Sequence, residues 1–149
     1  MEELIKLFND NGVRYILIGG QAVRLEGLPR FSMDWDFFIP SRDIENIKKI
    51  NCLLGAEFDV ELLPLGAKGE NFVQTYQTRW GLLQFHLGAP GLPTFDVAEE
   101  DSVKCETETG VAVKCLSIKR LLDSKKAAGR PQDQQDIEFL EMKLSGKSK

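Results

Sequence analysis

Two carboxylates spaced two residues apart, Asp34 and Asp36, lie within the apolar run of residues 33–39. Alternate side chains of a β-strand leave the same face, so a strand here would present both acids on one side. Like charges held together oppose folding unless a cation compensates them, and carboxylate oxygens are preferred ligands of Mg²⁺. The pair therefore indicates a divalent metal site.

A glycine pair, Gly19-Gly20, ends the apolar run of residues 15–18 and precedes a short helical pattern. Glycines at such a turn let backbone N–H groups approach an anion, although a tight strand-to-helix turn also favours glycine for geometry alone. The intervening residues 21–33 suffice for one helix and a return to a neighbouring strand. We therefore expect the glycine turn and the acids to lie side by side at one edge of a sheet.

Hydrophobic periodicity and turn residues predict the elements that would hold these groups. In the first half we expect a helix over 2–10, a strand over 13–18, a helix over 21–26, a strand over 31–39 and a helix ending at Leu54 with Ser41 as its N-cap. In the second half we expect an edge strand near 60–65, hairpins over 72–87 and 102–116, a loop over 89–93, and helices over 117–128 and 131–144.

This order predicts an α+β fold, with one mixed sheet flanked by helices and two helices at the C-terminus. Residues 1–144 would form a single domain, followed by a flexible tail over 145–149. In the strand over 31–39, Trp35 would face away from the acids, on the same side as Met33, and would pack in the core. Phe38 shares the face of the acids, where either core packing or stacking on a nucleotide base is open.

The composition excludes several classes of protein. With 149 residues, 42% apolar and 28% charged, the chain is typical of a globular domain, and no run is apolar enough to span a membrane. A net charge of −4 disfavours broad, nonspecific nucleic-acid binding. The three cysteines, Cys52, Cys105 and Cys115, form no CxxC pair and are expected to be buried thiols. We expect a cytoplasmic protein with no membrane partner.

Two segments resemble the signature of the DNA polymerase β-like nucleotidyltransferase superfamily. They are Gly19-Gly20-Gln21-Ala22 and Arg30-Phe31-Ser32-Met33-Asp34-Trp35-Asp36. The chain is similar to its small bacterial and archaeal group with a GG-x-A turn and an R-x-[ST]-x-D-x-D strand, which includes abortive-infection and lincosamide-type nucleotidyltransferases. Residues 116–137 resemble the K-x-x-x-G-R-x-x-D-x-x-D stretch that closes many of these proteins, so the resemblance spans about residues 13–140.

The resemblance implies a nucleotidyltransferase-type sheet and a role for each matched residue. Asp34 and Asp36 would bind two Mg²⁺ or Mn²⁺ ions, and an NTP, expected to be ATP, would be the substrate. The residues implied in binding its phosphates are Gly19, Gly20, Arg30, Lys126 and Arg130, with Lys125 as the alternate to Lys126. A solvated helix C-terminus would equally explain the basic residues, and Asp133 and Asp136 would complement only the N-terminus of the last helix.

One departure from the family pattern concerns its third carboxylate, which normally lies on a later strand and often acts as the base. In residues 80–87 no acid is present; Gln84 takes the expected position and His86, two residues on, shares its face. The glutamine carbonyl can coordinate Mg²⁺, and His86 could act as a base near neutral pH, or be a structural histidine. Glu61 and Asp96 are the other acids in strand-like runs.

Three functions are compatible with these features. The first is metal-dependent transfer of NMP from an NTP to a hydroxyl of a small molecule, a protein or tRNA. The second is a catalytically degenerate member that binds a nucleotide or a partner, as an antitoxin-like half of a toxin pair would. The third is a structural domain with a merely acidic surface. Because the domain is small, a homodimer or a partner subunit could complete the cleft.

Overall fold

A computed structural model describes residues 1–146, so residues 147–149 of the expected tail lie outside the described residues. One six-stranded sheet has the strand order β3-β4-β2-β1-β6-β5. The strands are β1 (Ile16–Ile18), β2 (Asp34–Phe38), β3 (Val73–Thr78), β4 (Gly81–His86), β5 (Val103–Glu106) and β6 (Ala112–Cys115). The helices are α1 (Glu2–Asp10), α2 (Gly19–Leu25), α3 (Ile44–Leu54), α4 (Phe95–Glu100), α5 (Ile118–Ala128), the 3₁₀ turn η1 (Pro131–Asp133) and α6 (Gln134–Leu144).

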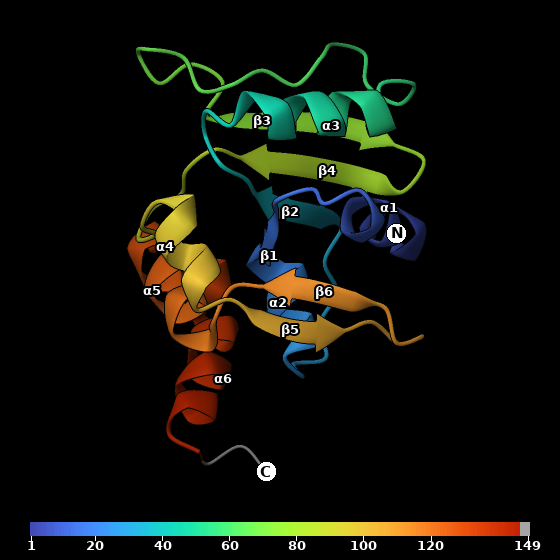
Figure 1. The fold of residues 1–149 in the computed structure, drawn as a ribbon. Helices are drawn as coiled ribbons and strands as arrows, with labels where there is room; N and C mark the ends of the chain where they lie inside the picture. The colour runs from blue at the N-terminus through green and yellow to red at the C-terminus, as the bar shows by residue number, and fades with distance from the viewer. Residues whose placement is uncertain (147–149) are drawn as a thin grey trace.

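The sheet is mixed, as the sequence predicted. β1 pairs antiparallel with β2 and parallel with β6, while β2 pairs parallel with β4. The antiparallel hairpins β3–β4 and β5–β6 lie at opposite ends of the sheet, and α5 and α6 lie together at the β5–β6 end (Figure 1). The expected α+β class, both hairpins and the two C-terminal helices are therefore confirmed.

β2 divides the core from the polar side of the sheet. Phe37, which lies between Asp36 and Phe38 in sequence, is fully buried and packs against Phe8 and Phe85 at ring centroid distances of 5.5 and 5.7 Å. Such aromatic contacts add to the stability gained by burying the rings themselves. The core therefore fixes the strand from one face and leaves the acids on the other.

The prediction of an edge strand near residues 60–65 is wrong, because residues 56–70 contain no helix or strand. Side-chain amides take the place of a strand ladder here. The Asn51 amide accepts from the Leu62 N–H at 2.8 Å and donates to the Leu62 carbonyl at 2.9 Å. Gln74 brackets the backbone of Leu63 in the same way, at 2.8 and 2.7 Å.

Several predicted boundaries and burials also need correction. Asp43, not Ser41, caps α3, since its carboxylate accepts from the Asn46 N–H at 3.1 Å. β2 begins only at Asp34 and not at Phe31, so Met33 precedes the strand, and it is 71% exposed. Cys52 is exposed, whereas Cys105 is partly buried and Cys115 is buried as expected.

Helix α4 was not predicted, and Asp96 lies in it and not in a strand. No helix in residues 1–146 combines the length and the apolar character needed to cross a membrane.

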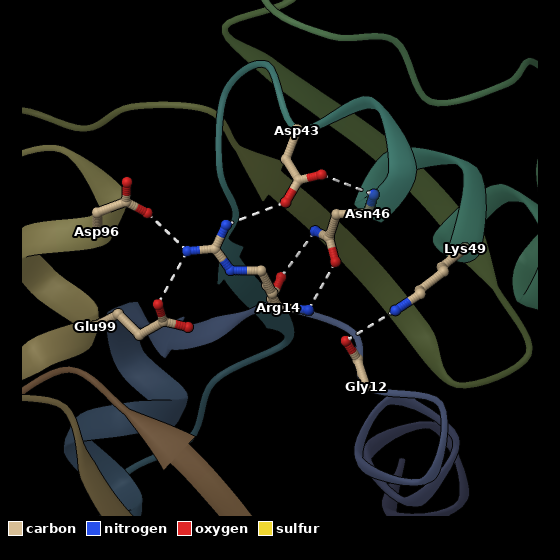
Figure 2. Close-up of polar contacts among 7 residues, drawn as sticks. All are labelled: Gly12, Arg14, Asp43, Asn46, Lys49, Asp96 and Glu99. Carbon is tan, nitrogen blue, oxygen red and sulfur yellow. Dashed lines mark hydrogen bonds and ion pairs between the residues drawn. The ribbon is translucent and has the colours of Figure 1, made fainter.

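Arg14, just before β1, joins the strand to α3 and α4 (Figure 2). The buried Asn46 side chain accepts from the Arg14 N–H at 2.7 Å and donates to the Arg14 carbonyl at 3.0 Å. The Arg14 guanidinium donates hydrogen bonds to three carboxylates at the two helices: Asp43 at 3.1 Å, Asp96 at 2.7 Å and Glu99 at 2.9 Å. The entry to β1, and so the position of the glycine turn that follows it, is held by these bonds.

We predict that Asn46→Ala lowers the free energy of unfolding by about 2–4 kcal/mol, because both backbone groups of Arg14 lose a partner where water is scarce. Urea denaturation followed by circular dichroism measures the change. Lys49→Ala is the control, since its single 3.5 Å contact with the Gly12 carbonyl is exposed and its loss should cost less than about 0.5 kcal/mol. Equal effects of the two substitutions would contradict the prediction.

Candidate active site

Strands β2 and β4 bring the predicted site residues onto one face of the sheet. In their parallel register Asp36 lies opposite Gln84, and Phe38 lies opposite His86. Asp34 shares the face of Asp36 because alternate residues of a strand point the same way. These acids, Gln84 and His86 line a cleft of about 610 Å³, together with the glycine turn, Arg30, Lys125 and Arg130.

The glycine turn lies directly against Asp36. Gly19 has a φ of +73°, and a Cβ atom there would lie 2.6 Å from the Asp36 Oδ2 atom. At Gly20 a Cβ atom would lie 2.9 Å from the Ser32 hydroxyl and 3.0 Å from the Arg30 guanidinium carbon. Neither position leaves room for a side chain, so the two glycines let the backbone approach the acid and the arginine closely.

Asp36 and His86 form a hydrogen-bonded pair. The distance between His86 Nε2 and Asp36 Oδ1 is 2.8 Å, and the side chains are 18% and 17% exposed. A carboxylate can only accept hydrogen bonds, so His86 Nε2 is the donor of this bond. His86 is thus bonded to an acid of the site, which the sequence left open.

The remaining position beside the acids belongs to Gln84. Within residues 1–146, no group of three or more His, Cys, Asp and Glu side chains is arranged to hold a metal ion. Two carboxylates and an amide oxygen are nevertheless all hard oxygen donors, the type that Mg²⁺ and Mn²⁺ prefer. This donor set fits a divalent cation, with one carboxylate fewer than the family pattern.

A cluster of buried ion pairs forms the cationic wall of the cleft. Lys125 is 7% exposed, and its ammonium lies 3.0 Å from Asp133 Oδ1 and 3.1 Å from Asp136 Oδ2. Arg130 donates to Asp133 at 2.8 Å, and Arg30 donates to Asp136. Asp133 and Asp136, at 2% and 3% exposure, therefore hold three cations at the cleft, and do more than cap the last helix.

Lys126 lies outside the cleft. It is exposed on α5 and its ammonium lies 3.2 Å from Glu141 Oε2, whereas its neighbour Lys125, the alternate, lines the cleft. Glu61 lies in the loop of residues 56–70, and Asp96 pairs with Arg14. Neither acid therefore lies on β4, where Gln84 takes the position expected for a third acid. The phosphate-binding role of Lys126 stays a prediction, and its position outside the cleft does not favour that role.

Two aromatic residues beside the acids belong to the core. Phe38 is 2% exposed and packs edge-on against Phe95 at a centroid distance of 5.5 Å. Of its two alternatives, core packing and stacking on a nucleotide base, the structure shows core packing. Trp35 is partly buried against the core, as predicted.

Sequence reasoning missed the structural part played by Ser32, Asp133 and Asp136. The spacing of the two aspartates, three residues apart after Arg130, places both on one side of a helical segment. That spacing was the available signal. Ser32 occupies the [ST] position of the R-x-[ST]-x-D-x-D pattern, but its approach to Gly20 is created by the fold.

Comparison with solved structures identifies the fold. The crystal structure of the lincosamide antibiotic adenylyltransferase LnuA, lincomycin-bound, matches with a TM-score of 0.64 and 18% identity, over 93% of this chain and 92% of that chain. The antibiotic-resistance factor ANT(2'')-Ia matches with a TM-score of 0.55 and 18% identity, over 97% and 80%. The sequence matches no protein-family model and no curated protein. This chain therefore has a nucleotidyltransferase-type fold, as expected.

The ion-pair cluster makes stability depend on pH. Burial alone would raise the pKa of Asp133, but hydrogen bonds from Arg130 and Lys125 outweigh it and lower the pKa below the ordinary value of 3.8. A carboxyl whose pKa is lower in the folded state contributes stability above its unfolded pKa, and that contribution is lost as the pH falls through the folded pKa. Asp133 should therefore stabilise the fold fully at neutral pH and lose this effect below about pH 4.

We predict that Asp133→Asn lowers the free energy of unfolding at pH 7 by about 3–5 kcal/mol, since Lys125 loses a charged partner in a buried site. The variant should also lose less stability than the native protein between about pH 5 and pH 3. Urea denaturation at several pH values measures both effects. Asp123→Asn, on the exposed face of α5, is the matched control and should change neither. Parallel pH curves for Asp133→Asn and the native protein would refute this account.

Proposed function

We propose that this protein transfers NMP from an NTP, expected to be ATP, to a hydroxyl acceptor. One observation carries the proposal: Asp34 and Asp36 line the same cleft as three cations, with the glycine turn against Asp36. Phosphates need cations and backbone donors, and a metal ion needs carboxylates, so such a cleft suits nucleotidyl transfer. The fold shared with LnuA supports it, and an NTP substrate agrees with the predicted cytoplasmic location.

The triphosphate would lie along the glycine turn and the cationic wall. Gly19 and Gly20 expose their backbone because neither has a Cβ atom, and Arg30 and Ser32 border Gly20. Arg130 is half exposed and can turn its guanidinium toward a phosphate while Asp133 holds it. Lys125 adds a positive charge that its pairing with two buried aspartates keeps in place.

Asp34 and Asp36, with the Gln84 amide oxygen, would hold Mg²⁺ or Mn²⁺. Such an ion, when bound, supplies charge neutralisation for the phosphates and for the pyrophosphate that leaves. Asp36 Oδ1 is already fixed by His86, and its Oδ2 faces the glycine turn. The protein thus orients this carboxylate between the phosphate subsite and the base.

The acceptor hydroxyl oxygen forms a bond to the α-phosphorus of the NTP. The bond from that phosphorus to the bridging oxygen breaks, and pyrophosphate leaves. His86 would take the hydroxyl proton at Nδ1, since Nε2 donates to Asp36 Oδ1. Asp36 then stabilises the imidazolium that forms.

A second cavity of about 490 Å³ adjoins the cleft and shares Ala89 and Pro90 with it. Its lining contains no charged side chain; Phe38, Leu87 and Phe95 are among its walls. We place the body of the acceptor here. Uncharged walls favour a small, largely apolar molecule among the three acceptor classes, since tRNA would need phosphate contacts.

We predict that Asp34→Asn and Asp36→Asn each reduce pyrophosphate release from ATP by at least about 100-fold, because the cation loses an anionic ligand. Coupled pyrophosphate detection with Mg²⁺ measures the rate, and calorimetry measures ATP binding. Asp59→Asn, an exposed acid outside the cleft, is the control and should leave both unchanged. Unaltered ATP binding in both cleft variants would reject the metal site.

A catalytically degenerate, antitoxin-like protein is the second candidate, and Gln84 at the third-acid position favours it. A toxin-like partner and a homodimer stay predictions within this alternative. Gln84→Asp separates the two functions. We expect pyrophosphate release from the native chain and a change of no more than about tenfold in Gln84→Asp.

The control is Gln77→Asp on the exposed side of β3, which should behave as the native protein. Activity that appears in Gln84→Asp and is absent from both the native chain and Gln77→Asp would establish degeneracy. The same assay with His86→Ala should show a loss of about 100-fold or more if His86 accepts the proton.

A further inference from the structure

Two large apolar side chains border the cleft without being covered by the protein. Phe31 is 81% exposed and Met33 is 71% exposed, and both line the cleft that holds Asp34 and Asp36. Single exposed apolar residues are common on protein surfaces. Two of them at the mouth of a cleft rich in charged groups require a more specific explanation.

Phe31 lies next to the proposed phosphate subsite in the chain. Its neighbours Arg30 and Ser32 both approach Gly20, at 3.0 and 2.9 Å from the position a Cβ atom would take there. Phe31 therefore adjoins the groups that would bind phosphate, three residues before Asp34. Three residues of extended chain span about 10 Å at most, so Phe31 stays near the acids.

The other aromatic rings near the acids are already committed. Phe38 is buried against Phe95, Trp35 packs against the core, and the His86 ring is bonded to Asp36. Among the residues that line the cleft, Phe31 is thus the aromatic ring with an uncovered face.

We propose that Phe31 is the platform on which the base of the bound nucleotide stacks, with Met33 as an apolar flank. This inference rests on the proposed function, since the triphosphate must lie at Gly20 for the base to reach the ring. In an NTP only the ribose separates the base from the α-phosphate, which matches the short step from the phosphate groups to Phe31. The exposed apolar surface is then covered by the ligand.

A phenyl ring offers no hydrogen-bonding atom, so stacking on it depends on the size of the base and does not distinguish the hydrogen-bonding groups at the edge of the base. Adenine and guanine nucleotides should therefore gain similarly from Phe31, and pyrimidine nucleotides should gain less. Phe31 would then contribute to affinity for purine nucleotides as a class.

The test compares ATP with inorganic tripolyphosphate, which has the phosphates but no base, using calorimetry with Mg²⁺ on the full chain. Phe31→Ala should raise the Kd for ATP by about 5- to 150-fold, the factor expected for loss of one base–aromatic stacking contact, and leave the Kd for tripolyphosphate unchanged. Phe31→Trp keeps an aromatic ring at this position and should bind ATP about as tightly as the native protein does. Val97→Ala, at a 43% exposed apolar residue of α4 that lines neither cavity, is the control and should bind ATP as the native protein does.

Each other outcome is decisive. An unchanged Kd for ATP in Phe31→Ala overturns stacking and leaves the proposed function standing. An equal loss for ATP and tripolyphosphate also overturns it, because Phe31 would then only shape the phosphate subsite. A native protein that binds neither ligand overturns the nucleotide site itself and stacking with it.

Discussion

The buried ion pairs of Lys125 with Asp133 and Asp136 are the constraint on which the cleft depends. Charges withdrawn from water stabilise a fold only when their partners are close and well oriented, and removal of one partner is costly. Here the pairs join α5 to η1 and α6, and Arg30 connects Asp136 to the segment that leads into β2. The C-terminal helices are thereby fixed against the strand that carries the acids. A site made from both ends of the chain needs such a connection.

The second constraint is that β2 serves the core and the cleft at once. Its acids repel each other, which opposes folding. Phe37 compensates on the opposite face, where it is fully buried among Phe8, Tyr15 and Phe85. Complete burial of a phenylalanine side chain contributes roughly 1.5–3 kcal/mol to folding, which opposes that cost. The strand can therefore hold two like charges at the surface without losing its place in the sheet.

The sequence predicted what depends on local pattern. The family resemblance placed Gln84 beside the acids, strand alternation put His86 on the face of Gln84, and the Gly-Gly turn was expected beside the acids. The missed features depend on contacts between distant residues, such as the Asn51 amide on the backbone of Leu62, which replaces a strand. Lys125 and Lys126 differ in role because adjacent helical residues point about 100° apart, and only packing of α5 on α6 selects the inner one.

Gln84 stands where the resemblance to nucleotidyltransferases implies a third acid, and this changes the charge beside Asp36. A third carboxylate beside Asp36 would add repulsion, whereas His86 donates a hydrogen bond to Asp36 Oδ1 at 2.8 Å. The neutral amide of Gln84 lies opposite Asp36 and adds no charge. Asp36 is therefore held by a donor from the protein before any ligand enters. Two acids arranged in this way need less compensating charge than three, so the cleft keeps its geometry with its own cations paired to Asp133 and Asp136.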